Sequence, residues 1–294
     1  MSRQDRNTFD ATSQRRLPIE TRKNPRGRPK SRFKESQAGT LQSLDRALNV
    51  LTAVARLERT TLSDLARLMD IPTATAHRIL MTLRAHSFVA FDEDRQEWMI
   101  GIEAYRTGAA FLKRNSIIEI GRPIMRKLMQ DTGETANLAV PDGTEVVFVA
   151  QVETPHPIRA FFPLGTRTSM HASGTGKAIL AELATPELDK ALAAMDLTAF
   201  TANTIVTRDS LLENLRATRD RGWSHDREER HAGMSCIGAS IHDEQGQPCA
   251  GISVSGPTFR FDARHIAELG TLVSVAAREI TRLSGGHAAA APVD

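Results

Sequence analysis

The chain has 294 residues, with 40% hydrophobic and 25% charged side chains, which is an ordinary composition for a globular protein of about two domains. No apolar run reaches the roughly 18 residues that would cross a bilayer, and the N-terminus lacks the apolar segment of a secretory signal. Two cysteines, Cys236 and Cys249, are too few for a disulfide framework or a cysteine-rich zinc site. We therefore expect a cytoplasmic protein with no membrane partner, no metal and no other cofactor.

The net charge of +3 hides a strongly basic N-terminal tail. Residues 1–40 hold eleven Lys and Arg against four Asp and Glu. Residues 1–39 also lack apolar periodicity, so we expect them to be disordered without a partner. The string Pro25-Arg26-Gly27-Arg28-Pro29-Lys30 resembles the core of an AT-hook, in which Arg26 and Arg28 enter a narrow A·T minor groove. The alternative is a solvated tail that contacts phosphates without sequence preference.

The next segments predict three helices. The first, over 41–57, has a broad apolar stripe formed by Leu44, Ala47, Leu48, Leu51, Val54 and Ala55. The second, over 62–69, should stop at Asp70-Ile71-Pro72, because proline disfavours helix at the residue before it. Thr73 is then expected to cap the third helix.

The third helix has an apolar side and a polar side. Ala76, Ile79, Leu80 and Leu83 repeat at helical spacing, whereas Thr75, His77, Arg78 and Thr82 point elsewhere. A helix-turn-helix presents its recognition helix to a major groove in this way. Taken alone, the stretch also fits a generic helical hairpin.

A β-hairpin is predicted directly after the recognition helix. Residues 88–91 and 98–100 are short β-prone runs, and the polar residues 92–97 lie between them. Arg95 is the single positive group in this acidic hairpin and is a natural contact to phosphate or to the minor groove. The alternative is a surface ion pair with Asp92 or Glu97.

These motifs resemble the DNA-binding domain of the IclR family of bacterial transcriptional regulators. The similarity rests on LDRALNVL (44–51), on LSDLARLMDIPTATAHRILMTL (62–83) and on the hairpin. It implies a winged helix-turn-helix over 40–101 in which Thr75 and Arg78 contact the major groove, with Thr73 and His77 as further contacts. Thr73-Ala74 stands where the family often has Lys-Ser, so the base contacts are expected to differ.

The rest of the chain predicts a linker helix and an α+β domain. A helix over 102–114 lies in a linker (102–115) that in the family helps to pair two subunits; burial on its own chain is the alternative. Further helices are expected at 117–129, 186–194, 209–221 and 262–283, and the small residues within 171–183 run into another helix. Strands are expected at 135–140, 145–152, 158–162, 235–242 and 249–255. Helices on an antiparallel sheet make an α+β domain over 116–285, followed by a loose tail over 286–294.

The string SGTGKA (173–178) invites a phosphate-loop interpretation, which fails on its flanks. That motif needs Gly where His171 stands and Ser or Thr where Ala178 stands. Backbone N–H groups at the start of a helix still form an anion site, for a carboxylate as well as for a phosphate. The alternative is that small residues merely allow close packing.

The second half resembles the GAF-like effector domain of the IclR family, and most of all its glyoxylate-responsive members. HASGTGKA (171–178), GMSCIGA (233–239) and ISVSGP (252–257) carry the similarity. It places the effector ligands at Gly174, Thr175, Asp226, Met234, Cys236, Ser253 and Ser255. Thr175 stands where a smaller alanine is usual, which changes the expected pocket volume.

The chemistry of these residues suits a small oxo-acid. Ser253 and Ser255 are two apart on one strand and share a face, so with the N–H groups of Gly174 and Thr175 they could hold a carboxylate. Asp226 could accept hydrogen bonds from the hydrated aldehyde of glyoxylate. Cys236 lines the pocket in this interpretation, or forms a reversible thiohemiacetal.

We therefore expect a regulator rather than an enzyme, a homodimer or tetramer that binds an imperfect palindrome in promoter DNA and senses an oxo-acid such as glyoxylate. One alternative is an enzyme that uses Cys236 as a redox or nucleophilic centre and is tethered to DNA. Another is an architectural DNA-binding protein dominated by its tail. The resemblance leaves both activation and repression open.

Overall fold

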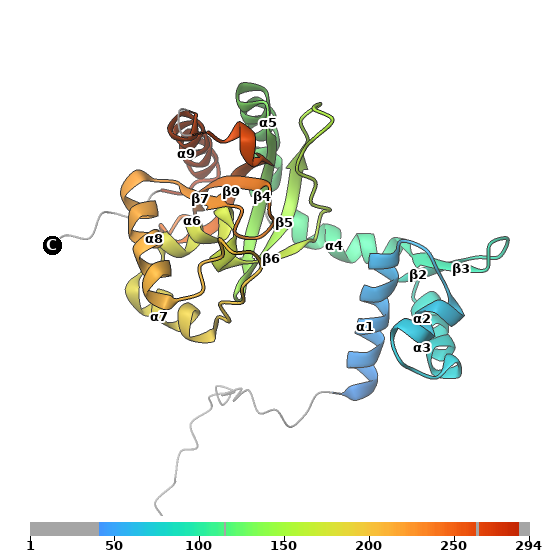
Figure 1. Ribbon diagram of the computed structural model, residues 1–294. Coiled ribbons are helices and arrows are strands. Elements are labelled where there is room, and N and C mark those ends of the chain that lie inside the picture. Colours follow the sequence, from blue (N-terminus) through green and yellow to red (C-terminus); the bar gives the residue numbers. More distant parts are fainter. Residues whose placement is uncertain (1–40, 115, 263–264, 288–294) are drawn as a thin grey trace, which may run out of the picture.

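The computed structural model describes residues 41–114, 116–262 and 265–287 and contains two folded regions (Figure 1). A winged helix-turn-helix is followed by a linker helix and an α+β domain with an antiparallel sheet, which confirms the predicted fold class. The AT-hook-like segment with Arg26 and Arg28 lies outside the described residues, as do residues 288–294 of the predicted tail. No helix within the described ranges is long and apolar enough to cross a membrane.

The first domain is built on three helices and a small sheet. Its elements are α1 (Gln42–Leu57), β1 (Thr60–Thr61), α2 (Leu62–Leu68), α3 (Thr73–Ala85), β2 (Val89–Asp92) and β3 (Glu97–Ile100). The strands pair in the order β1-β3-β2, so β2 and β3 form the expected wing. Val54, Leu65, Leu80 and Trp98 meet in the core, where all four side chains are buried.

Two details of the predicted helices were wrong. Leu44 and Leu48 of the expected α1 stripe are 55% and 54% exposed, because only the second half of α1, from Val50 on, reaches the core. Thr73 is the first helical residue and not the cap. Pro72 takes the cap position, where its φ of −57° suits a helix entry and no side chain caps the helix.

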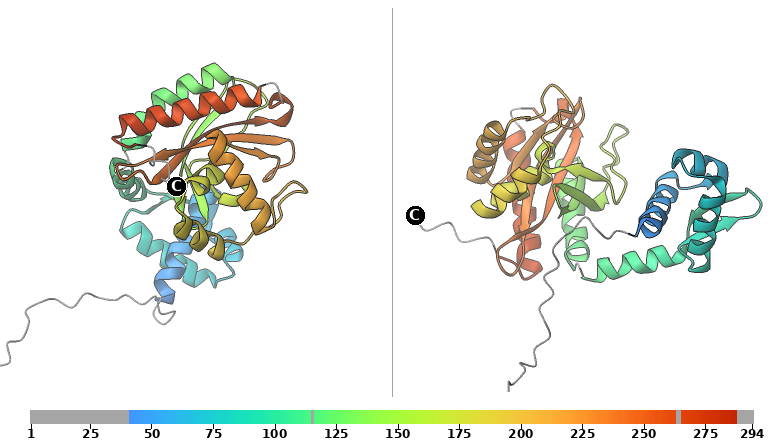
Figure 2. Two further views of the ribbon diagram at one scale, coloured as in Figure 1. Left: turned by 90° about the vertical axis from the view of Figure 1, so that its left-hand side faces the viewer. Right: turned by 90° about the horizontal axis from the view of Figure 1, so that it is seen from below.

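The second domain is a six-stranded sheet with helices on both faces. After the linker helix α4 (Ile102–Arg114) come α5 (Ser116–Thr132), β4 (Thr135–Asp142), β5 (Glu145–Val152), β6 (Arg167–Ser169), α6 (Gly174–Glu182), α7 (Thr185–Ala194), α8 (Arg208–Arg221), β7 (Ser224–Arg227), β8 (Met234–His242), β9 (Pro248–Pro257) and α9 (Ile266–Leu283). The strand order is β6-β5-β4-β9-β8-β7, and every pair is antiparallel. Helices α5 and α9 lie side by side on one face (Figure 2), and α6, α7 and α8 cover the other.

The edges of this sheet differ from the prediction. Residues 158–162 are not a strand, because the place beside β5 is taken by β6, where Thr168 pairs with Val146. The polar edge strand β7 was not predicted, and neither was the two-residue β1. The last helix begins at Ile266, later than the expected Asp262.

The two faces of the central strands have different chemistry. On β9, Ile252 and Val254 enter the apolar core under α5 and α9, whereas Ser253 and Ser255 face the other way, as their spacing predicts. On that second face α6 comes very close to the sheet, because the facing residues are glycines. A Cβ at Gly238 would lie 2.6 Å from the carbonyl carbon of Gly174.

We expect Gly238→Ala to destabilise the domain by about 1–3 kcal/mol, because the added methyl group meets backbone atoms of α6 that cannot move aside cheaply. Urea unfolding, followed by far-UV circular dichroism, measures the change. Gly108→Ala is the matched control, since nothing lies within 4 Å of its Cβ position. Equal unfolding midpoints for the two variants would contradict the tight contact.

Candidate functional site

The recognition helix α3 presents a polar surface. Thr73, His77 and Arg78 are exposed, while Ala76 and Leu80 hold the helix on the domain core. Thr75 is half-buried and lines a groove between α3 and α1. The four predicted major-groove residues therefore lie on one helix, and three of them are exposed.

The same groove contains a basic residue that the sequence reasoning missed. Arg46 of α1 lines it together with Thr75 and Arg78. The side chain is exposed and forms no ion pair within the described part of the chain. Its place beside the recognition helix depends on how α1 crosses α3, which no local pattern reports.

The wing leaves its arginine available for a partner. The acidic residues Asp92 and Glu97 are both engaged by Arg59, at 3.1 and 3.6 Å. The alternative of an ion pair between Arg95 and either acid was therefore wrong. Arg95 contributes only its backbone N–H to Asp92 and keeps an exposed guanidinium.

A small cavity lies on the α6 side of the large sheet. Its walls come from Phe148, Phe162, Thr168, Ala172, Ser173, Asp226, Arg230, His231, Met234, Ser235, Cys236 and Ser255. The space open to the centre of a water molecule is about 30 Å³, enough for roughly two waters or a ligand of a few heavy atoms. No group of three His, Cys, Asp or Glu side chains in the described ranges could hold a metal ion.

The structure divides the seven predicted effector residues into two sets. Asp226, Met234, Cys236 and Ser255 line the cavity, whereas Gly174, Thr175 and Ser253 lie behind it between α6 and the sheet. A Cβ at Gly174 would come within 2.7 Å of the Cys236 sulfur. The glycine thus makes room for a thiol, and the entrance to α6 reaches the cavity through Ala172 and Ser173, the N-cap, rather than through Gly174 or Thr175.

Polar groups continue from the cavity into the sheet. Asn137 is fully buried; its Nδ2 donates to the Ser255 hydroxyl at 3.2 Å, and its Oδ1 accepts from Gln151 at 2.9 Å. The hydroxyls of Ser253 and Thr175 are buried without a hydrogen-bond partner in the described structure. Sequence reasoning missed Asn137 and Gln151, although an asparagine inside an apolar strand was an available signal.

The Cys236 thiol has the wrong electrostatics for a nucleophile. Burial, with a further contribution from Asp226, raises its pKa to about 11, although the Ser255 hydroxyl and the Gly174 N–H oppose that shift. A reactive cysteine needs a lowered pKa. The thiol therefore stays protonated near neutral pH and acts as a small polar wall.

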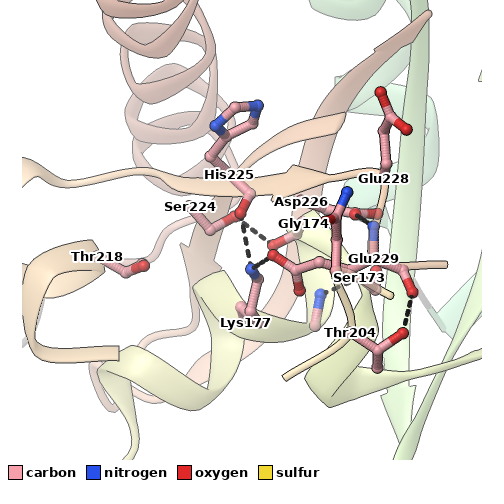
Figure 3. Close-up of polar contacts among 12 residues, drawn as sticks. Ser173, Gly174, Lys177, Thr204, Thr218, Ser224, His225, Asp226, Glu228 and Glu229 are labelled. Carbon is pink, nitrogen blue, oxygen red and sulfur yellow. Dashed lines mark hydrogen bonds and ion pairs between the residues drawn. The ribbon is translucent and has the colours of Figure 1, made fainter. Parts of the chain in front are cut away.

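A buried ion pair fixes the loop between β7 and β8. Lys177 of α6 is completely buried; its Nζ donates to the backbone carbonyl of His225 at 2.7 Å and to Glu229 at 2.5 Å (Figure 3). On the same loop the Glu229 N–H donates to Asp226 at 2.8 Å. Asp226 of β7 is thereby held at the wall of the cavity by the loop that follows its strand.

The Asp226 carboxyl titrates near neutral pH. Burial is the main cause that raises its pKa to about 7, and the negative charge of Glu229 adds to the effect. Burial also raises the pKa of Glu229, while Lys177 opposes that shift. The cavity therefore contains a carboxyl group that can be either a hydrogen-bond donor or an acceptor under physiological conditions.

Comparisons with known proteins agree over both domains. The family model "IclR helix-turn-helix domain" matches residues 43–93, and "Bacterial transcriptional regulator IclR C-terminal" matches residues 109–282. The chain is 42% identical to the HTH-type transcriptional regulator BhcR of Paracoccus denitrificans, over 90% of this chain and 95% of that protein. It is 38% identical to the transcriptional repressor IclR of Escherichia coli, over 89% and 96%. The Thermotoga maritima IclR crystal structure superposes with a TM-score of 0.71 at 29% identity, covering 84% of this chain and all of that one.

We expect stability to fall as the pH rises from about 4 to about 7, because folding favours the protonated form of Asp226 and this preference is lost once the native carboxyl ionises. Asp226→Asn keeps the carbonyl acceptor and removes the titration. The unfolding free energy of the variant relative to wild type should therefore increase across this window. Urea unfolding at several pH values measures it, with the exposed Asp220→Asn as control. A pH-independent difference would contradict the raised pKa.

Proposed function

The chain belongs to the IclR family of ligand-responsive, DNA-binding transcriptional regulators, and from this premise we propose that it is a homodimer whose effector is a small oxo-acid, with glyoxylate as first choice. The observation that carries the proposal is the cavity, which is small and lined by both polar and apolar groups. Its position in the C-terminal domain separates ligand sensing from DNA binding.

The exposed side of α3 is the proposed base-reading surface. Thr73, Thr75, His77 and Arg78 supply hydroxyl, imidazole and guanidinium groups for base edges in a major groove. Arg46 on α1 and Arg95 in the wing are the proposed contacts to phosphate or to the minor groove. Two such surfaces in a twofold dimer match an imperfect palindrome.

Exposed apolar side chains support the dimer. Three leucines at the start of α1 are 54–70% exposed: Leu41, which directly precedes the helix, Leu44 and Leu48. On α4, Ile102 and Tyr105 are 65% and 68% exposed. Large apolar side chains gathered on two helices favour burial against a second copy. The linker helix is therefore the proposed pairing element as well as the connection between domains.

The cavity favours a short acid over an aromatic one. The hydrate of a two-carbon oxo-acid has six heavy atoms, which suits the limited space, while an aromatic acid would require the walls to move. Asp226 would accept hydrogen bonds from the hydrated aldehyde, and Cys236, Met234 and Ser255 would contact the rest. The protonated Cys236 thiol supports binding rather than the alternative of an enzyme.

We expect Arg78→Ala to weaken binding to promoter DNA by about 1–3 kcal/mol, because a good arginine contact to a base contributes about that much discrimination. Electrophoretic mobility shift at fixed salt, on DNA from upstream of its own and neighbouring genes, measures the affinity. Arg216→Ala removes the same charge from an exposed site on α8 and should bind like wild type. If both variants bind promoter DNA with equal affinity, the assignment of α3 is contradicted. If wild type binds a full palindrome and a single half-site with equal affinity, the dimer is contradicted.

We expect glyoxylate to change DNA affinity more than pyruvate, glycolate, oxalate or an aromatic acid does. Fluorescence anisotropy at fixed salt measures this, since phosphate contacts make affinity salt-dependent. Asp226→Asn should bind glyoxylate more weakly, because an amide is a poorer acceptor for the hydrated aldehyde. Unchanged affinity would contradict that role. If another acid changes DNA affinity and glyoxylate does not, glyoxylate is not the effector. If the protein shows no site-specific DNA binding, the alternatives of an enzyme or an architectural protein are favoured.

A further inference from the structure

A chain of three polar side chains crosses the large sheet and ends at the cavity wall. Gln151 of β5 donates from its Nε2 to Oδ1 of Asn137 on β4, at 2.9 Å, and Asn137 donates from its Nδ2 to the Ser255 hydroxyl on β9, at 3.2 Å. The three strands are neighbours in the order β5-β4-β9. Of these three residues only Ser255 lines the cavity, so Asn137 and Gln151 would act on a ligand through Ser255.

A backbone group fixes the orientation of the Asn137 amide. An asparagine can present either its oxygen or its NH2 group to a hydroxyl, and the two arrangements give the hydroxyl opposite roles. Here the NH2 group also donates to the Thr135 carbonyl oxygen at 3.5 Å, and a carbonyl oxygen can only accept. Turning the amide around would bring two acceptor oxygens together. The amide nitrogen of Asn137 therefore faces Ser255, and its oxygen faces Gln151.

This orientation gives the Ser255 hydroxyl a defined role. Because its oxygen already accepts a hydrogen bond from Asn137, its own proton is available to another group. Cys236 lies directly opposite Ser255 in the β8–β9 register, and both residues line the cavity. The Ser255 hydroxyl opposes the rise in the pKa of the Cys236 thiol, as a donor to sulfur does. A ligand beside Cys236 would therefore meet a hydrogen-bond donor at Ser255.

The other serine on the same face of β9 is not held in this way. Ser253 lies opposite Asn137 in the β4–β9 register, yet its hydroxyl has no hydrogen-bond partner within the described structure. The amide reaches instead to Ser255, whose register partner on β4 is Thr135. A free hydroxyl can either donate or accept. The two serines are therefore not equivalent, because Asn137 restricts Ser255 alone.

We propose that Asn137 is a positioning residue of the effector site, which holds the Ser255 hydroxyl as a hydrogen-bond donor and is itself held by Gln151. The site thereby selects a ligand that offers an acceptor oxygen to Ser255, as the carboxylate or carbonyl group of an oxo-acid does. The inference rests on the proposed function and deepens it. It assigns a role in ligand selection to two side chains that do not line the cavity.

Asn137→Asp tests this role, because it keeps the size of the side chain and replaces the donor to Ser255 with an acceptor. The new carboxylate would take the Ser255 proton away from the ligand. Isothermal titration calorimetry on the full chain should show a loss of about 10- to 100-fold in glyoxylate affinity, as expected for a lost hydrogen bond to a charged group. Asn203→Asp is the matched control, since it makes the same change at an exposed position of the same domain and should bind glyoxylate like wild type.

A double-mutant cycle with Ser255→Ala separates positioning from a general effect of the new charge or of a disturbed sheet. If Asn137 acts through the Ser255 hydroxyl, Asn137→Asp should cost only about threefold in glyoxylate affinity once that hydroxyl is absent. If the losses of the two single variants multiply, or if Asn137→Asp binds glyoxylate like wild type, the role of Asn137 is overturned and the proposed function stands.

Gln151→Glu gives a second route to the same test, should Asn137→Asp fail to fold by far-UV circular dichroism. Gln151 is only half-buried, and a carboxylate there would face the Asn137 oxygen and favour the reversed amide. Its loss of glyoxylate affinity should again depend on the Ser255 hydroxyl, and an equal loss with and without that hydroxyl would overturn the inference. If wild type binds neither glyoxylate nor the other small acids, the proposed function and this inference both fall.

Discussion

The effector domain depends on the burial of Lys177. A fully buried ammonium without a partner would be penalised by several kcal/mol, and here Glu229 and the His225 carbonyl compensate it. The pair joins α6 to the β7–β8 loop, which follows Asp226 at the end of β7 and contributes Arg230 and His231 to the cavity wall. Replacing the pair with apolar groups could preserve stability, but it would remove the constraint that places the loop. The ion pair thus determines where this loop's groups lie at the cavity wall.

A second constraint is the contact between α6 and the sheet. The glycines of β8 and β9 allow the helix to approach so closely that Gly174 and Gly238 have no room for a side chain. The facing strand positions are small and polar, and Asn137 and Ser255 satisfy each other there. A purely structural sheet would place apolar residues on this face, as it does under α5 and α9. The polar residues on the face toward α6, such as Asn137 and Ser255, are therefore retained at the expense of hydrophobic burial, as expected next to the proposed binding site.

The sequence predicted those elements whose stability is local or whose apolar pattern is strong. The recognition helix, the wing, the linker helix and the central strands β4, β8 and β9 are of this kind. The errors fall where tertiary context decides. Strand β7 is polar and forms because β8 pairs with it. The place beside β5 that residues 158–162 were expected to take is occupied by β6. The exposure of Leu44 depends on where the core of the first domain ends. For the same reason the sequence motifs indicated Asp226 and Cys236, while Arg46 became a candidate only when distant segments were brought together.

The two proposed sites differ in how ionic strength acts on them. Arg46, Arg78 and Arg95 are exposed, so their attraction to phosphates is screened over a Debye length of about 8 Å at physiological salt. Asp226 and the Lys177–Glu229 pair are buried, and screening by salt is much weaker there. Salt therefore changes DNA affinity strongly while it changes effector affinity much less. Because the coupling between two sites is the same free energy whichever ligand binds first, salt changes how much DNA is bound without abolishing the response to the effector.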